Sequence, residues 1–123
     1  MKPEDYGLIA IVGVSADASK YGHMIFRDML KGDFNVKGVN PKGGFVLGNN
    51  IYRNLAEIEK KPDVVIMVVP PAAAELVMED CNKLGIKEVW LQPGSESEAA
   101  LAKAKAYGIK AEAACFMVAN GIW

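Results

Sequence analysis

Residues 13–22 combine glycine, serine and lysine in an order that suits a phosphate-binding turn. Gly13 would allow a ligand to approach the backbone closely, and the Ser15 hydroxyl could donate a hydrogen bond. Lys20 could add a mobile positive charge, and the N-terminus of the helix that follows supplies the positive end of a dipole. We therefore expect a phosphate group to be bound by this segment, at Gly13, Val14, Ser15, Lys20, Tyr21 and Gly22.

A purely structural interpretation of this segment stays open. Gly13 and Gly22 could serve only to permit a tight turn and close packing of a helix against a strand. The dinucleotide pattern G-x-G-x-x-G is not present, because Ser15 occupies the position of its second glycine.

The end of the second expected strand also departs from a nicotinamide-binding pattern. A carboxylate for the ribose hydroxyls is expected there, but Asn40 and Pro41 occupy the position and Lys42 follows. A lysine at this place favours a ligand that carries an additional phosphate near its ribose.

Residue types for catalysis are sparse. Residues 13–17 depart from the hydrolase elbow G-x-S-x-G at the last position, and His23 lies too near Ser15 for a strand-separated triad. Cys81 and Cys115 have no metal-ligand spacing, so we predict neither a metal site nor a catalytic residue. Cys81 is expected in the core, whereas Cys115 is either a small buried hydrophobe or a reactive thiol.

Composition limits the class of protein. The chain has 123 residues, of which 51% are hydrophobic and 24% charged, and this predicts one domain over residues 1–123. With 14 Lys and Arg against 15 Asp and Glu, we expect no nucleic-acid partner. The longest apolar run, residues 64–74, is too short to cross a membrane. No secretory signal is visible, so we expect a cytoplasmic protein without a membrane partner.

Apolar runs alternate with segments of helical spacing, which predicts βαβ units. Helices are expected to end at left-handed glycines, at positions 32, 85 and 108. Capping boxes are expected at Asn54 and at Ser95. The expected buried faces are Ala73, Leu76, Val77, Cys81 and Leu84 in one helix and Leu101 and Ala104 in the next. The expected strands are residues 8–14, 35–39, 63–69, 89–91 and 109–113.

This alternation predicts a Rossmann-like doubly wound parallel sheet in a single three-layer α/β/α domain. Residues 8–14 should form the central strand. A ligand should bind where the strand order reverses, between the strand that ends at Val14 and the strand that ends at Val69. Residues 118–123 have no predicted place.

Five segments, taken in order, carry a family resemblance. They are residues 11–15 (IVGVS), 39–44 (VNPKGG), 63–66 (DVVI), 69–71 (VPP) and 85–87 with 89–94 (GIK, VWLQPG). Over about residues 7–115 the chain resembles the CoA-binding domain family. The small stand-alone members of that family are similar to the N-terminal domain of the succinyl-CoA synthetase alpha subunit.

The resemblance implies a Rossmann-like fold that binds coenzyme A. It implies that the loop of Gly13 and Ser15 lies near the phosphates and that Asn40, Pro41 and Lys42 lie near the adenosine. The rest of the channel would be lined by Val69, Pro70, Pro71, Gln92 and Gly94. In the synthetase the phosphorylated histidine belongs to a second domain, which we do not find in these residues, so the resemblance does not imply ligase activity.

Three functions are compatible with these residues. The first is a non-catalytic protein that binds CoA or an acyl-CoA, as a monomer or a homodimer. The second is an NAD(P)-binding oxidoreductase-like protein, which the missing ribose carboxylate disfavours. The third is a thiol-linked regulatory protein in which Cys115 forms a mixed disulfide with CoA.

Overall fold

The computed structural model describes residues 3–123, and Met1 and Lys2, at the start of the predicted domain, lie outside the described residues. One sheet has the strand order β3-β4-β2-β1-β5-β6-β7. All neighbouring strands are parallel except β3 and β4. The strands are β1 (Ile9–Val12), β2 (Val36–Val39), β3 (Phe45–Val46), β4 (Asn49–Tyr52), β5 (Val64–Met67), β6 (Glu88–Leu91) and β7 (Lys110–Ala113).

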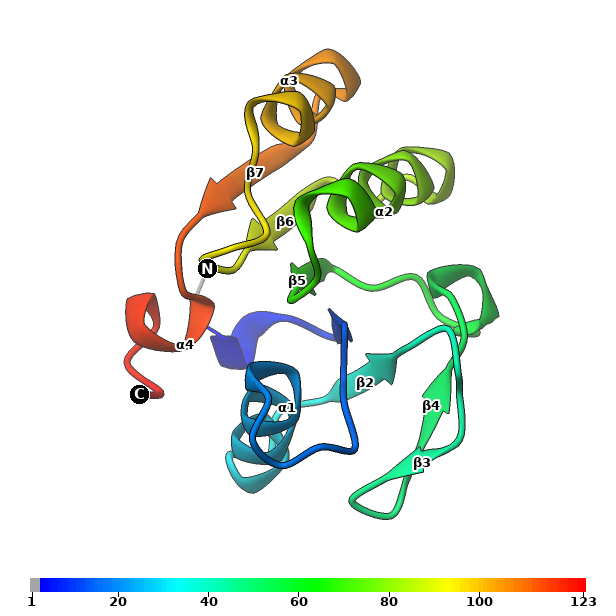
Figure 1. Ribbon diagram of the computed structural model, residues 1–123, viewed down its shortest axis with the longest axis vertical. Helices are drawn as coiled ribbons and strands as arrows, with labels where there is room; N and C mark the ends of the chain where they lie inside the picture. The colour runs from blue at the N-terminus through cyan, green and yellow to red at the C-terminus, as the bar shows by residue number, and fades with distance from the viewer. Residues whose placement is uncertain (1–2) are drawn as a thin grey trace.

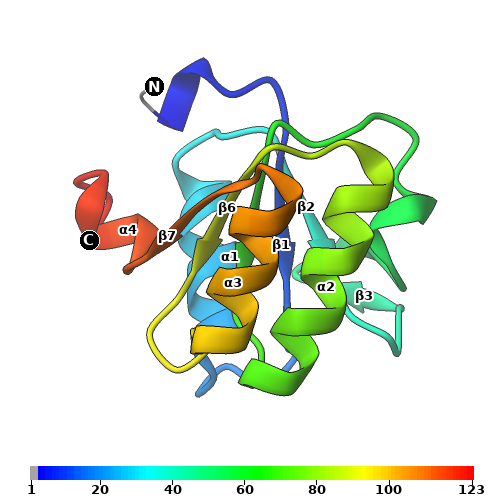
Figure 2. The same ribbon diagram turned by 90° about the horizontal axis from the view of Figure 1, so that it is seen from above.

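Helices cover both faces of this sheet. In Figure 1 the sheet lies between α2 and α3 on one side and α1 and α4 on the other. Figure 2 shows α2 and α3 side by side across their face of the sheet. The predicted three-layer, Rossmann-like α/β/α architecture is therefore confirmed. The helices are α1 (Tyr21–Lys31), α2 (Pro71–Leu84), α3 (Glu98–Tyr107) and α4 (Phe116–Ala119), with 3₁₀ turns at η1 (Pro3–Asp5) and η2 (Leu55–Glu57).

Strand β1 lies at the centre of the sheet, as the continuous apolar run predicted. All of its residues are buried, because helices cover it on both faces. It pairs with β2 on one side and with β5 on the other. The chain thus moves outward from β1 through β2 and then returns to start again at β5. The strand order reverses between β1 and β5, at the predicted place.

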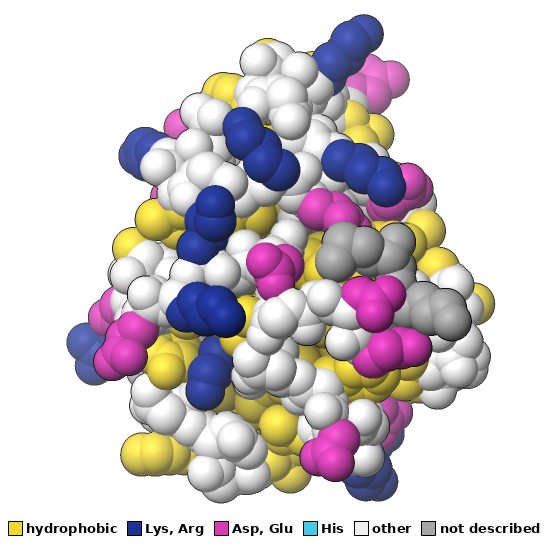
Figure 3. Space-filling view, turned by 180° about the vertical axis from the view of Figure 1, so that it is seen from behind, with side chains coloured by type: hydrophobic (Ala, Val, Ile, Leu, Met, Phe, Trp, Pro, Cys, Tyr) yellow, Lys and Arg dark blue, Asp and Glu magenta, His cyan; other side chains and the backbone are white. Residues whose placement is uncertain are grey.

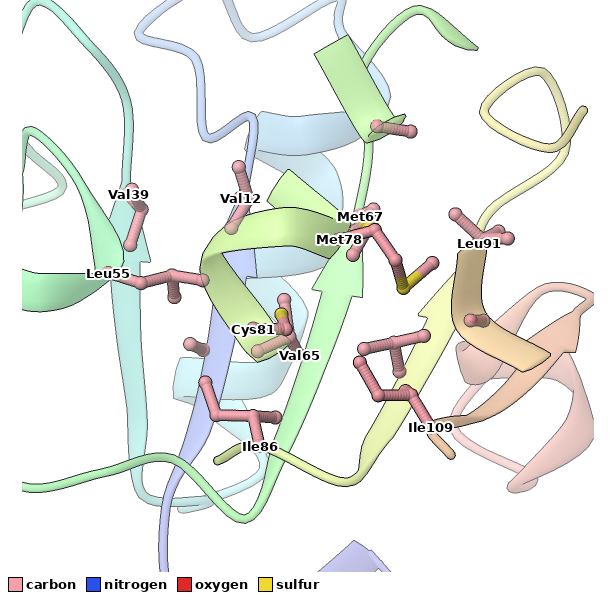
Figure 4. Packing of buried hydrophobic residues seen from close by; sticks show 14 of the residues in the cluster. Val12, Val39, Leu55, Val65, Met67, Met78, Cys81, Ile86, Leu91 and Ile109 are labelled. Atoms are coloured by element: carbon pink, nitrogen blue, oxygen red, sulfur yellow. The ribbon is translucent and has the colours of Figure 1, made fainter. Parts of the chain in front are cut away.

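The core on the α2 and α3 side is centred on α2. Met78 and Cys81 of α2 pack over Val65 and Met67 of β5 (Figure 4). The expected burial of Cys81 is confirmed, and burial raises the pKa of its thiol to about 12. The expected burial of Leu76 is wrong, because its side chain is 64% exposed.

The buried face of α2 is offset from the predicted stripe. Ala74, Met78 and Cys81 follow one another at helical spacing and face the sheet, which leaves Leu76 on the outer side. In α3 the buried residues are Ala100 and Ala104, while Leu101 is exposed. Many alanines make the apolar face of such a helix ambiguous in the sequence.

The C-terminal cap of α1 is not the left-handed Gly32 that was predicted. Gly32 has φ −80°, and the left-handed residue is Asp33, with φ 62°. Asp33 N donates to Leu30 O and Phe34 N donates to Met29 O, which is the Schellman pattern with Asp33 at C′. Glycines 85 and 108 do take the predicted left-handed caps.

Hairpin β3–β4 was not predicted. Its turn places Leu47 at φ 53° and Gly48 at φ 76°. Leucine rarely adopts this left-handed conformation. The turn pair is Leu-Gly and not the Asn-Gly or Asp-Gly pair that marks such a hairpin, so the sequence did not indicate it. Strand β4 pairs in parallel with β2 and extends the sheet on that side.

Charged side chains of both signs share the surface. Figure 3 shows Lys and Arg together with Asp and Glu on the face opposite to the view of Figure 1. Among the helices of residues 3–123, none has the length and apolar character needed to cross a membrane.

A polar contact fastens the N-terminal segment to the sheet. The Tyr6 hydroxyl donates to a carboxylate oxygen of Glu88, and Trp90 Nε1 donates to the same oxygen at 3.2 Å. Burial, followed by the Glu88 hydrogen bond, raises the pKa of the Tyr6 hydroxyl well above its usual range.

This raised pKa makes stability depend on pH in alkaline solution. The unfolded chain loses the Tyr6 proton near pH 10 while the folded chain keeps it, so the free energy of unfolding should fall as pH rises above about 10. Tyr6→Phe should flatten this fall. Urea denaturation at pH 8, 10 and 11 measures the slope, and an equal slope in both proteins would contradict the assignment.

Candidate functional site

The carboxyl end of β1 is packed without space for side chains. Gly13 has φ +104°, and a Cβ atom on it would lie 2.1 Å from Val68 O, just beyond β5. A Cβ atom on Gly22, in the first turn of α1, would lie 1.9 Å from Gly13 O. Both glycines are therefore required for packing, as the structural interpretation held. Their contact with a ligand stays a prediction.

The loop between β1 and α1 is ordered by its own hydrogen bonds. Ser15 Oγ accepts from Asp17 N at 3.0 Å, and Asp17 Oδ1 accepts from Ser19 N at 2.9 Å and Ser19 Oγ at 2.7 Å. These bonds from Ser19 hold the pKa of Asp17 below its usual value. The His23 ring is buried, and its Nδ1 lies 2.9 Å from Ser15 O. His23 therefore packs against the loop and supports its shape.

Asn40 joins this loop to the turn after β2. Its Nδ2 donates to Val14 O at 2.6 Å, and its Oδ1 accepts from Lys42 N at 2.8 Å. The Asn40 amide thus binds backbone atoms on both sides, at the position where a dinucleotide fold has its ribose-binding carboxylate.

A cavity of about 390 Å³ lies between the two loops and hairpin β3–β4. The structure brings together four of the predicted site residues around it, namely Val14, Ser15, Asn40 and Lys42. The exposed ring of Phe45, from β3, lines the same cavity and was missed by the sequence analysis.

A second cavity, of about 210 Å³, lies on the α2 side of β1 and β2. It brings the predicted residue Pro41 next to Arg53, Val77 and Asp80. Arg53 was not predicted, because it follows directly after the unpredicted strand β4. Its Cγ lies 3.2 Å from the place where a Cβ on Gly43 would stand, so the Arg53 stem packs on the turn that carries Lys42.

A third cavity, of about 350 Å³, lies beyond the ends of β5 and β6. It brings together the predicted residues Tyr21 and Gln92 with Val68, Pro93, Cys115, Val118 and Trp123. Gln92 is buried, and its Oε1 accepts from Phe116 N at 2.7 Å. The Gln92 side chain therefore holds the start of α4, a role that the sequence did not indicate.

The prediction that Ser95 caps the following helix is wrong. Ser95 is buried, and its Oγ accepts from Val69 N at 3.0 Å, so it ties the end of β5 to the loop after β6. Ser97 caps α3 instead, by accepting from Ala100 N at 3.0 Å. Only Ser95 has a glutamate three residues later, so the S-x-x-E pattern indicated Ser95, whereas the cap is Ser97 two residues further on. Gly94 forms the turn between Gln92 and Ser95 with φ +96°.

The helices on either side of the reversal point begin without side-chain caps. Lys20 is the N-cap residue of α1 and Pro70 that of α2, which then starts at Pro71. Neither helix has an acidic residue in its first turn. By contrast, η2 and α3 are capped by Asn54 and Ser97. Uncapped N-termini expose backbone N–H groups and a positive dipole end, which favours an anion between β1 and β5.

Comparison with known families agrees with this arrangement. Residues 8–121 match the family described as CoA binding domain. The chain belongs to the CoA-binding domain family. Its match covers both loops and all the residues named around the three cavities except Trp123, and the resemblance inferred from the five sequence segments is confirmed.

Curated relatives of this CoA-binding domain are longer proteins, and only a part of each matches this chain. It is 33% identical over 81 residues to an ADP-forming acetate-CoA ligase of Methanocaldococcus jannaschii, covering 64% of this chain and 11% of that protein. It is 31% identical over 87 residues to the alpha subunit of ADP-forming acetate-CoA ligase I of Pyrococcus furiosus, covering 66% of this chain and 19% of the relative. The chain thus spans between a tenth and a fifth of these relatives.

Solved structures of similar size share the fold. A conserved hypothetical protein from Pyrococcus furiosus has a TM-score of 0.85 and 37% identity, covering 90% of this chain and 97% of the other. A hypothetical protein from Pyrococcus horikoshii has a TM-score of 0.87 and 30% identity, covering 94% and 82%.

The contact at Gly22 can be tested by adding a single methyl group. In an exposed helix, alanine in place of glycine stabilises by about 1 kcal/mol. In this CoA-binding domain, Gly22→Ala should lower the free energy of unfolding by about 2 kcal/mol or more, because the methyl group would meet the Gly13 carbonyl. Urea denaturation decides the sign, and unchanged or increased stability would show that the two backbones are not so close.

Proposed function

We propose that this chain binds coenzyme A or an acyl-CoA at the carboxyl edge of its sheet and has no catalytic activity of its own. The observation that carries the proposal is the meeting of anion-binding groups at the reversal point between β1 and β5. The uncapped N-termini of α1 and α2, the Ser15 hydroxyl and Lys42 all lie at this edge, in a chain of the CoA-binding domain family.

The residues present fit the chemical parts of CoA. Its diphosphate requires N–H donors, which the first turn of α1 offers beside the Gly13 loop. Its 3′-phosphate requires cationic side chains, and Lys42 and Arg53 lie on the turn after β2 and directly after β4. The cavities on the two sides of β1 and β2 have room for parts of the nucleoside. CoA would supply a thiol for acyl groups, and the chain's own residues bind and orient it.

The proposal of binding without catalysis is supported by the structural contacts of two potentially reactive side chains, His23 and Ser15. His23 is buried against the carbonyl of Ser15, and Ser15 Oγ accepts from a backbone amide within its own loop. The ligase activity of the curated relatives belongs to much longer chains. The expected cytoplasmic location and the monomeric or homodimeric state stay predictions.

The nicotinamide alternative is less well supported by the same site. Asn40 replaces the ribose-binding carboxylate, and its amide is engaged with Val14 O and Lys42 N. The thiol-linked alternative has one supporting observation, since Cys115 is half-buried and lines the cavity beyond β5 and β6.

Lys42 should recognise the 3′-phosphate. Lys42→Ala should weaken CoA binding by about 1.5 to 3 kcal/mol, because a charge-assisted contact is lost. Isothermal titration calorimetry should show a much smaller loss for 3′-dephospho-CoA. Lys110→Ala, at the amino end of β7, is the matched control and should bind CoA like the wild type. Equal losses for both ligands would remove Lys42 from the phosphate site.

The thiol-linked alternative can be tested by mass. A Cys115 thiolate would attack CoA disulfide, form a Cys115–CoA disulfide and release one CoA thiol. If the alternative is correct, the intact mass should rise by one CoA moiety, reversibly with a reductant, and Cys115→Ser should prevent it. No adduct on the wild-type protein would eliminate this function and leave reversible binding.

A further inference from the structure

The C-terminal segment folds back on its own domain and closes one side of the third cavity. Gly121 takes φ +71°, and the N–H groups of Ile122 and Trp123 donate to Met117 O at 2.8 and 3.1 Å. The Trp123 indole Nε1 then donates to Asp28 Oδ2 of α1 at 2.7 Å. Residues 118–123, which had no predicted place, therefore run from α4 back to α1.

The walls of this cavity are mainly apolar and aromatic. The rings of Tyr21 and Trp123 lie with centroids 6.3 Å apart, and Val118 and Pro93 belong to the same lining. Tyr21 is 67%, Val118 62% and Trp123 43% exposed. Single exposed apolar side chains are common, but three gathered around one cavity of about 350 Å³ form a concave apolar site of the size used for small molecules.

The position of this cavity relates it to the proposed ligand. Tyr21 is the first residue of α1, so the cavity begins at the helix terminus proposed to hold the diphosphate. The cations proposed for the 3′-phosphate, Lys42 and Arg53, lie toward β2 and β4, on the other side of that terminus. The pantetheine arm must then leave toward the ends of β5 and β6, where Val68 and Pro93 line the cavity.

We propose that this cavity receives the acyl group of a short-chain acyl-CoA and that Trp123 is the specificity-determining wall. The inference rests on the proposed function and names the class of its ligand. Free CoA ends in a thiol and has no acyl group to fill this cavity, so the apolar side chains would stay in contact with water. The acyl chain of an acyl-CoA would cover them. Each buried methylene should strengthen binding about three- to fourfold, until the chain reaches the end of the cavity.

Contacts at both the backbone and the indole hold the wall formed by Trp123 in place. Phe116 and Met117 are fully buried and fix the base of the C-terminal segment. Beyond them, the indole is held by the hydrogen bond to Asp28, and the ring contact with Tyr21 lies at the surface. Asp28 is itself bound to Arg27, whose Nε lies 2.8 Å from Asp28 Oδ1, and this pairing keeps the acceptor in place for the indole.

An acyl-chain series measured by isothermal titration calorimetry tests this inference. The probes are CoA, acetyl-CoA, butyryl-CoA and octanoyl-CoA. For the wild-type protein, binding should strengthen about tenfold from acetyl-CoA to butyryl-CoA, which adds two methylenes, and should gain much less per carbon beyond that. Trp123→Ala should reduce the tenfold ratio to nearly one, whereas Trp123→Phe should keep most of it.

The matched control is Leu101→Ala, another exposed apolar side chain, located on α3. It should keep the wild-type ratio. Tight CoA binding with no gain from acetyl to butyryl, or an unchanged ratio in Trp123→Ala, would overturn the acyl site and leave the proposed function intact. If CoA and all of its thioesters fail to bind, the proposed function itself fails.

Discussion

The close approach of three backbone segments at Gly13 is the constraint on which the site depends. The end of β1, the residues after β5 and the first turn of α1 meet there with no room for a Cβ atom on Gly13 or Gly22. This contact turns the chain out of the sheet directly after Val12 and brings the uncapped N-terminus of α1 to the reversal point. Ser15 and Lys42 line a cavity beside the loop that leads to this terminus, and Tyr21, the first residue of α1, lines another.

The sequence contained enough information to predict the architecture. Continuous apolar runs indicate strands covered on both faces, and short connections between strands and helices restrict the topology to a doubly wound parallel sheet. The central place of β1 and the reversal at β5 follow from these rules. The candidate residues around Ser15, Asn40 and Lys42 were found because they directly follow predicted strands, whose carboxyl ends share one edge.

What the sequence could not predict depends on contacts between distant residues. The hairpin β3–β4 turns through Leu47 in a left-handed conformation that its residue type does not favour, so Arg53 beyond it was missed. Ser95 has the type and spacing of a cap, but its hydroxyl is used by Val69 N of another segment. The Trp123 indole is placed through contacts with α1, including a hydrogen bond to Asp28, 95 positions earlier in the chain.

Hydrogen–deuterium exchange with and without saturating CoA tests the central claim most directly, because it reports both whether the ligand binds and where. The account predicts slower exchange in residues 13–24, 40–44 and 68–72, with α3 unaffected, and no such protection with NAD. Protection by CoA that is confined to other parts of the chain, or equal protection by NAD, would contradict a CoA site at the junction of β1, β5 and α1.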